Sequence, residues 1–258
     1  MNELEIKKSI IKKFRKEIWS KFIKAIKDYD LIKENDNICV CISGGKDSFL
    51  LALCFEELKK HHKFNFNTKY LVMDPGYLDI NLKQIVDNAK LLNLDIEVFK
   101  SDIFDVVDRV GGDSPCYLCA RMRRGYLYAK AKELGCNKIA LGHHFNDVIE
   151  TVMLNILYNG VFGGMLPILD SKNFEGMQLI RPLYYVKEKD IIHWVKYNNL
   201  KFIDCACKVT KKSLGKRKEV KLLIEELVKT NKNADINIMN SLKNVNKETI
   251  LGYMEDGE

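Results

Sequence analysis

The chain has 258 residues, of which 47% are hydrophobic and 30% charged, and its formal net charge is +7. This length and composition favour an ordinary globular protein with one medium-sized domain and appendages. The sequence contains no stretch of about 18 apolar residues, and Met1–Lys16 lacks the apolar centre of a signal peptide, so we expect a cytoplasmic protein that makes no membrane contact.

The predicted elements begin with a helix and then alternate between strands and helices. Apolar residues between Ile6 and Asp28 recur mostly at spacings of three and four, which predicts an amphipathic helix packed against the main domain. A buried strand at Ile38–Ile42 precedes a helix from Asp47 to His61. The remaining strands are predicted at Tyr70–Met73, Ile96–Phe99 and Lys138–Leu141, and the remaining helices at Ile80–Leu92, Met122–Leu134, Asp147–Tyr158 and Lys187–Asn199. We expect an insert at Gly111–Cys119 and a loop at Gly160–Gln178.

This alternation predicts an α/β fold with a doubly wound parallel sheet, whose ligands bind beyond the carboxyl ends of the strands. We divide the chain into an N-terminal helix (residues 1–30), an α/β domain (31–201) and a small helical tail (202–258). The tail is strongly basic between Lys208 and Lys221, and Arg121, Arg123 and Arg124 form a second basic cluster. Such clusters favour a phosphate-rich partner, although each is also compatible with a solvated surface.

A phosphate-binding loop is predicted at Ser43–Ser48, between the first strand and its helix. The glycines allow close approach of the backbone, while N–H groups and the helix dipole face an anion. Lys46 and the hydroxyl groups of Ser43 and Ser48 complete the cradle. The spacing differs from that of the nucleoside-triphosphatase P-loop. It resembles the SGGxDS loop of the PP-loop ATP pyrophosphatases, which cleave ATP to AMP and pyrophosphate.

The eight cysteines are expected to be free thiols, because no export signal precedes them. Cys116 and Cys119 are separated by two residues, as in many metal sites, and Cys205 or Cys207 offers a third ligand. Three thiolates on a 4Fe-4S cluster leave one iron open, whereas four close the cluster. Structural zinc and a redox dithiol are the alternatives. The other four cysteines lie in apolar strand or helix contexts and are predicted to be small core residues: Cys39, Cys41, Cys54 and Cys136.

Three further segments carry a resemblance to one family. They are Cys116–Tyr128, Lys138–His144 continuing to Asp147, and Ile180–Leu183 followed by Lys187–Ile191. Together they resemble the TtcA family of tRNA 2-thiocytidine synthetases, over nearly the whole chain. Members of that family use ATP and a 4Fe-4S cluster held by three cysteines to thiolate cytidine 32 in the tRNA anticodon loop.

The resemblance implies a set of site residues. Cys116 and Cys119 match the first two cluster ligands. The third is Cys207 or Cys205, because this chain has one residue between them where the family has two, and we favour Cys207. The implied ATP-binding residues, with magnesium, are Ser43, Gly44, Gly45, Lys46, Asp47, Ser48, Asp74, Gly142, His143 and Asp147. The catalytic residues would be Cys116, Cys119, Cys207, Lys46 and Asp47. The RNA-binding residues would be Arg121, Arg123, Arg124, Lys211, Lys212, Lys216, Arg217 and Lys218.

Other residues near these motifs allow more than one interpretation. Asp74 precedes Pro75-Gly76 and could be only a turn residue. His143 and His144 could contact nucleotide or pack, and Arg181 could equally lie on the surface. The chain has Asn146 where the family has a carboxylate, which puts magnesium or substrate contacts there in question.

The implied reaction begins when the C2 carbonyl oxygen of the base attacks the α-phosphate of ATP. Sulfide carried by the open iron then replaces the adenylated oxygen. Expected partners are tRNA, a sulfur donor such as a cysteine desulfurase or free sulfide, and a second copy in a homodimer. The alternatives are a sulfurtransferase acting on another RNA position or on a small molecule, lysidine synthesis, and a regulatory ATP- and cluster-binding module without turnover.

Overall fold

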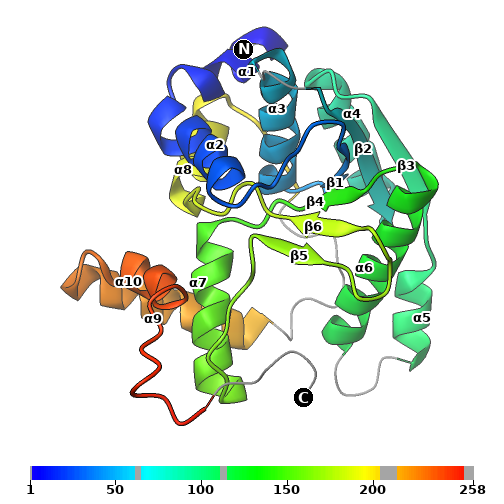
Figure 1. Cartoon of the computed structure of the whole chain (residues 1–258). Helices are drawn as coiled ribbons and strands as arrows, with labels where there is room; N and C mark the ends of the chain where they lie inside the picture. Colours follow the sequence, from blue (N-terminus) through cyan, green and yellow to red (C-terminus); the bar gives the residue numbers. More distant parts are fainter. Residues whose placement is uncertain (1, 62–64, 111–114, 204–213, 253–258) are drawn as a thin grey trace. The chain divides into compact units, whose positions relative to one another are not determined.

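The computed structural model describes residues 2–61, 65–110, 115–203 and 214–252 (Figure 1). It contains two compact units. The first comprises Met1–Asn146 and Leu166–Leu214, and the second comprises Asp147–Met165 and Gly215–Glu258. The part of the predicted tail from Gly215 onward therefore shares a unit with residues 147–165, which were predicted to belong to the α/β domain.

A six-stranded sheet forms the centre of the first unit, in the order β3-β2-β1-β4-β6-β5. All neighbouring pairs are parallel except β5 and β6, which are antiparallel. The doubly wound sheet is thus confirmed, with one antiparallel edge strand added. The strands are β1 (Asn37–Ile42), β2 (Asn67–Asp74), β3 (Ile96–Lys100), β4 (Lys138–Ala140), β5 (Ile168–Asp170) and β6 (Gln178–Ile180). The sequence analysis did not predict β5 or β6, because three residues are too few for a hydrophobic period to show.

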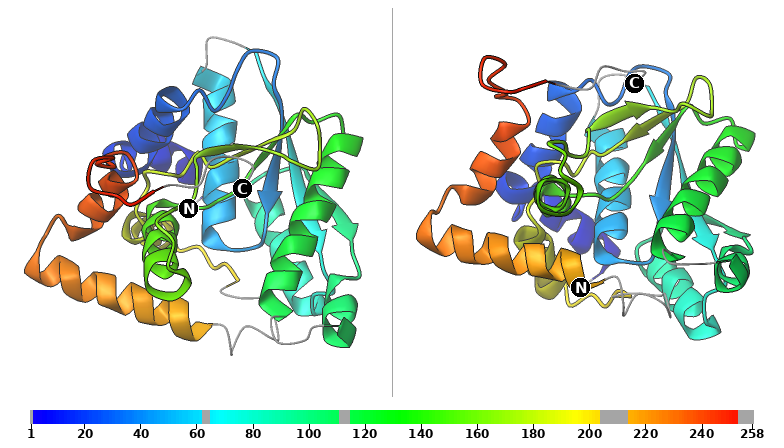
Figure 2. Two further views of the ribbon diagram at one scale, coloured as in Figure 1. Left: turned by 60° about the horizontal axis from the view of Figure 1, so that its bottom comes forward. Right: turned by 90° about the horizontal axis from the view of Figure 1, so that it is seen from below.

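Helices cover both faces of this sheet, and Figure 2 shows α3 and α6 on opposite sides of it. Cys39 and Cys41 of β1 pack in one core cluster with Tyr128 and Ala131 of α6. Because side chains alternate along a strand, the intervening Val40 faces the other side, where α3 lies.

The helices of the first unit are α1 (Glu3–Ile11), η1 (Arg15–Trp19), α2 (Ser20–Asp28), α3 (Lys46–His61), α4 (Asp79–Leu91), α5 (Ile103–Val110), α6 (Pro115–Glu133) and α8 (Glu188–Tyr197). α7 (Phe145–Leu154) begins in the first unit and continues into the second, which also holds η2 (Asn155–Asn159), α9 (Leu214–Thr230) and α10 (Ala234–Ser241).

The N-terminal helix predicted between Ile6 and Asp28 is in fact three segments, α1, η1 and α2. The wider η1 segment has π-helical hydrogen bonding. Five buried apolar residues from Ile10 to Ile26 recur every fourth position, and Trp19 and Ala25 are buried beside them. This spacing is longer than the 3.6-residue turn of an α-helix. A wider turn in the middle therefore helps to keep this apolar stripe on one face. The predicted packing of the stripe is confirmed, since Ile10, Ile18 and Phe22 are fully buried.

The stretch before Met122 also differs from the prediction. Residues 103–110 form α5, and α6 begins at Pro115, well before the predicted start at Met122. Cys116 and Cys119 therefore lie in the first turns of a helix and not in a loop. Proline at the first helical position explains the early start, since its fixed φ suits a helix and its missing N–H group would have no helical acceptor there.

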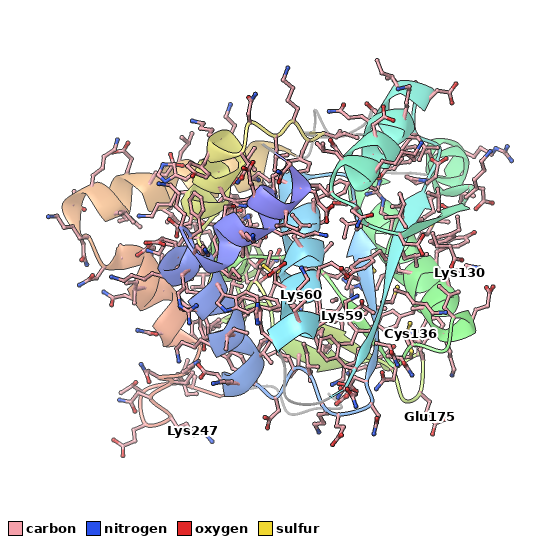
Figure 3. All side chains as sticks on the ribbon, turned by 90° about the horizontal axis from the view of Figure 1, so that it is seen from above. Lys59, Lys60, Lys130, Cys136, Glu175 and Lys247 are labelled. Atoms are coloured by element: carbon pink, nitrogen blue, oxygen red, sulfur yellow. The ribbon has the colours of Figure 1, made fainter. Side chains whose placement is uncertain are left out.

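The core prediction for the other four cysteines is confirmed. Cys39, Cys41, Cys54 and Cys136 are all buried free thiols. Burial, together with the nearby charge of Glu57, raises the pKa of Cys54, so this thiol stays protonated and unreactive. Figure 3 places Cys136 at the sheet, between Lys130 of α6 and the turn that carries Glu175. Among the described residues, no helix is both long and apolar enough to cross a membrane.

Candidate active site

The loop after β1 has a backbone shape that requires glycine. Gly44 has φ +90°, in the left-handed region. A Cβ atom on Gly44 would also lie 2.8 Å from Cγ1 of Ile85. Gly45 has no such crowding, because its nearest atom, the carbonyl oxygen of Ile203, would be 3.7 Å from a Cβ. Gly44 therefore fixes the turn that brings the first turn of α3 to the carboxyl edge of the sheet.

Ser48 holds this loop closed. Its hydroxyl accepts a hydrogen bond from the backbone N–H of Ser43 at 3.1 Å and donates one to the carbonyl oxygen of Gly45 at 2.9 Å. The side chain is buried, and its single hydroxyl proton is used within the loop. The hydroxyl of Ser43 lies 3.3 Å from that of Ser48. Ser48 thus positions the loop, which leaves the backbone N–H groups and Lys46 as the groups suited to bind phosphate.

Lys46 is held between two carboxylates. Its amine lies 3.3 Å from Asp47 and 3.3 Å from Glu188, the first residue of α8. Burial favours the neutral amine, but the charges of Asp47 and Glu188 outweigh it and raise the pKa of Lys46 above its ordinary value. Lys46 is therefore a cation at neutral pH. Its side chain is 27% exposed, so a phosphate group can reach it.

Asn146 places Glu188 beside this lysine. The side-chain oxygen of Asn146 accepts a hydrogen bond from the backbone N–H of Glu188 at 3.0 Å, at the start of α8. An amide oxygen serves here as well as a carboxylate oxygen, because both accept from a backbone N–H group at a helix start. Asn146 therefore makes a contact here that a carboxylate at the same position could also make. Glu188 is not among the predicted site residues, although it lies within the motif run Lys187–Ile191.

The loop after β4 lies directly against the start of α3. A Cβ atom on Gly142 would lie 3.0 Å from the backbone carbon of Asp47 and 3.0 Å from the backbone nitrogen of Ser48. Only glycine allows this approach without a backbone shift. It brings buried His144 to Asp47, with Nε2 3.8 Å from Oδ1 of the carboxylate.

The neighbouring His143 contacts Arg181, which follows β6. The Nε group of Arg181 donates to Nδ1 of His143 at 3.3 Å, and the Arg181 guanidinium also donates to the carbonyl oxygen of Leu166. Arg181 is buried, so the surface interpretation is wrong. Because Nδ1 of His143 accepts this hydrogen bond, any proton on the neutral ring is at Nε2.

Asp74 lies at the end of β2, and its side chain shapes a turn. The Oδ1 atom accepts hydrogen bonds from the backbone N–H groups of Gly76 at 3.0 Å and Tyr77 at 2.7 Å. The residue is buried. These contacts support the interpretation of Asp74 as a strand-end turn residue. Its predicted contact with nucleotide or magnesium stays a prediction.

The predicted cluster ligands lie only partly in the described structure. Positions 116 and 119 are three residues apart near the N-terminus of α6, so they share one helix face. The side chains of Cys116 and Cys119 are outside the described residues, as are Cys205, Cys207, Lys211 and Lys212. Within the described side chains, no group of three or more His, Cys, Asp or Glu is arranged to hold a metal ion.

The predicted RNA-binding residues on α6 have different environments. Arg121 and Arg124 are exposed. Arg123 is half-buried, with its guanidinium 5.5 Å from the centre of the Phe104 ring. Among the described atoms its Nε group is buried and has no hydrogen-bond partner. Arg121 and Arg124 are therefore the better placed of the three to meet a partner.

The described basic residues of the tail lie in the second unit. Arg217 of α9 pairs with Asp147 at 3.0 Å and with Glu150 at 2.8 Å, both on α7. Lys216 lies 4.8 Å from the centre of the Tyr158 ring, and Lys218 is exposed. Arg217 thus ties α9 to α7. Asp147, predicted to contact ATP, is its partner in that ion pair.

Comparison with known proteins decides the family. The model of the PP-loop domain matches residues 14–212. The tRNA-cytidine(32) 2-sulfurtransferase 1 of Francisella philomiragia is 38% identical over 250 residues, covering 95% of this chain and 94% of that protein. The tRNA-cytidine(32) 2-sulfurtransferase of Geobacter metallireducens is 34% identical over 230 residues, covering 88% of this chain and 89% of that protein. The chain belongs to this family of PP-loop proteins.

A solved structure shares the fold of this tRNA-cytidine(32) 2-sulfurtransferase family member. The U34-tRNA thiolase NcsA from Methanococcus maripaludis, solved with its 4Fe-4S cluster, superimposes with a TM-score of 0.71. The two sequences are 22% identical, and the alignment covers 87% of this chain and 76% of NcsA. The resemblance inferred from the cysteine, histidine and proline motifs is therefore confirmed at the level of family and fold.

Proposed function

We propose that this protein is an ATP-dependent tRNA-cytidine(32) 2-sulfurtransferase. One observation carries the proposal: Lys46 stands charged at the carboxyl edge of the sheet, on a glycine loop at the start of α3, in a member of this family. A helix start of this kind binds phosphate, because its free N–H groups and dipole face the anion.

ATP is the substrate that the loop would hold. The C2 carbonyl oxygen of cytidine attacks the α-phosphate, a P–O bond to the base forms, and pyrophosphate leaves. Lys46 and the N–H groups at the start of α3 offset the charge that develops on the phosphates. When Lys46 moves to phosphate, the carboxylates of Asp47 and Glu188 become oxygen ligands of the type that magnesium prefers.

The donor set fits a 4Fe-4S cluster. Positions 116 and 119 share a face near the N-terminus of a helix, where the helix dipole favours thiolates, and Cys207 or Cys205 supplies the third sulfur. When bound, such a cluster supplies an iron without a protein ligand, at which the incoming sulfur is presented. The C–S bond forms as the C–O bond breaks, and AMP leaves with the original oxygen.

The partners follow from this reaction. The basic residues Arg121, Arg124 and Lys218 would contact tRNA phosphates, which position the substrate without reading its sequence. A cysteine desulfurase or free sulfide would provide sulfur. A homodimer and a cytoplasmic location complete the proposal.

The test is product formation in anaerobically prepared protein. Wild-type protein with ATP, magnesium, sulfide and unmodified tRNA should yield 2-thiocytidine, measured by mass spectrometry of tRNA nucleosides. Cys116→Ala should lose thiolation and still bind ATP, because position 116 lies outside the phosphate loop. Cys54→Ala, which changes a buried thiol in α3, controls for loss of a cysteine as such. Thiolated product from Cys116→Ala would contradict the assigned role.

A further inference from the structure

A cavity of about 580 Å³ lies in the first unit, between α6 and the turn that joins β5 to β6. Figure 1 shows this turn beside α6. Arg121, Arg124 and Tyr128 line it from the helix, and residues 169–174 line it from the turn. Its volume is in the range of sites that hold a small molecule or one residue of a polymer.

The cavity has a fixed aromatic wall. The rings of Tyr128 and Phe174 are stacked, with centroids 5.2 Å apart and planes inclined by 12°. The turn is closed by its own hydrogen bonds, because the N–H of Phe174 donates to the hydroxyl of Ser171 and the N–H of Met177 donates to the carbonyl oxygen of Phe174. Tyr128 is buried and Phe174 half-buried, so the wall is part of the core and exists before any ligand binds.

The rim of the cavity is cationic. Arg121 and Arg124 on the helix and Lys172 on the turn are all exposed lining residues. One carboxylate, Asp170, belongs to the lining, and its Oδ1 accepts a hydrogen bond from the Gln178 side chain at 2.8 Å. The lining therefore holds three cations and one carboxylate, which is hydrogen-bonded to a neutral amide. This balance favours a ligand with more than one negative charge.

Other charged groups nearby do not change this balance. Lys130 on α6 pairs with Glu133 at 2.7 Å and with Glu97 at 3.4 Å, so it is occupied outside the cavity. Glu175 lies at the exposed tip of the turn and points away from Lys130 in Figure 3. Neither lines the cavity.

The position of the cations along α6 relates them to the proposed thiolation site. A helix rises about 1.5 Å per residue, so position 124 lies about 7.5 Å along the helix from position 119. Successive nucleotides of a stacked strand are about 3.4 Å apart. Along the helix axis, Arg121 therefore lies about one nucleotide from the second cysteine, and Arg124 about two nucleotides from it.

We propose that this cavity binds the phosphodiester backbone of a single-stranded segment of the substrate tRNA, a few nucleotides from the base that is modified. The inference rests on the proposed function. Arg121, Arg124 and Lys172 would each contact a phosphate, and Phe174 offers a ring for a base to stack on, as in other single-strand sites. Lys172 and the β5–β6 turn are thereby added to the RNA-binding surface.

The test compares two charge reversals. Lys172→Glu removes one cation from the rim, and Lys132→Glu makes the same change at an exposed position of α6 that does not line the cavity. Lys172→Glu should weaken tRNA binding about tenfold, equivalent to about 1.4 kcal/mol, and lower the slope of log K against log salt by about 0.7. Lys132→Glu should stay within about twofold of wild type. Circular dichroism and ATP binding confirm that each variant is folded.

The outcomes separate this inference from the proposed function. If wild type forms 2-thiocytidine but Lys172→Glu and Arg124→Glu keep the wild-type KM for tRNA and the wild-type salt slope, the cavity does not bind RNA and the proposal is overturned. If wild type forms no thiolated product but the variants still weaken tRNA binding, the function fails and the cavity assignment stands.

A third measurement distinguishes a strand from a lone phosphate. Inorganic phosphate added at constant ionic strength should not displace tRNA from the wild-type protein. Displacement that is lost in Lys172→Glu would indicate a site for one phosphate group and would overturn the assignment to an RNA strand.

Discussion

A lysine pairs with carboxylates at each end of the parallel strands, but the two lysines differ in burial. At the amino edge, Lys138 of β4 is 2% exposed, lies 2.7 Å from Asp36 and donates to the carbonyl oxygen of Leu31. At the carboxyl edge, Lys46 is 27% exposed and lies 3.3 Å from each of its two carboxylates. The buried contact of Lys138 connects the segment before β1 to β4. The proposed function requires the more exposed contact of Lys46 to exchange a carboxylate for a phosphate.

The largest expected effect is a loss of folding stability on substitution of Lys138. Lys138→Met should lower the free energy of unfolding by about 3–5 kcal/mol, because it leaves the buried carboxylate of Asp36 without its cation. Urea unfolding followed by circular dichroism measures this change. Lys132→Met, at an exposed site, should unfold at the wild-type midpoint. A wild-type midpoint for Lys138→Met would show that the buried pair does not stabilise the fold, and the contrast between the edges would disappear.

Lys46→Met should affect the reaction and not the fold. The rate of thiolation at saturating tRNA should fall about 10²–10³-fold, the usual loss when one group that stabilises transition-state charge is removed. The urea midpoint should change little, because the ion pairs of Lys46 are partly exposed. Thiolation is measured by nucleoside mass spectrometry at several ATP concentrations. An unchanged rate with normal ATP dependence would remove Lys46 from the proposed mechanism.

The smallest effect concerns the pH dependence of the Lys46 contact. The pKa of Lys46 is raised in the folded state, so the folded protein keeps the Lys46 proton at pH values above ~10.4, where the unfolded chain loses it. The ion pairs of Lys46 therefore stabilise the fold fully below pH ~10.4, and their contribution declines as the pH rises above that value. Glu188→Gln should lower the free energy of unfolding by about 0.5 kcal/mol at pH 7–9, and the difference from wild type should narrow above pH ~10.4.

Chemical unfolding at a series of pH values measures this difference. Asp87→Asn, which removes the exposed partner of Lys83, is the matched control and should leave the curve unchanged. A constant difference across the whole pH range would mean that Glu188 does not act through the charge of Lys46.

The sequence by itself determined the local parts of this protein. The strand, glycine turn and helix from Asn37 to His61 are contiguous, and their residue pattern alone predicts both the elements and the anion site between them. The family was also readable, because its motifs are short runs of neighbouring residues. The strands β5 and β6 are not predictable from the pattern because each has only three residues. The predicted start of α6 lies too late because Pro115 suits a loop as well as the first position of a helix.

Only the tertiary structure decided which distant groups meet at the site. Glu188 lies 142 positions from Lys46 in the sequence, and Arg181 lies 38 positions from His143, yet both pairs are in contact. The parallel sheet causes this, since each crossover returns the chain so that successive strands end at the same edge. The close approach of Gly142 to the start of α3 and the capping of α8 by Asn146 arise in the same way. Sequence patterns report the state of neighbouring residues, and they carry little information about which loops a sheet brings together.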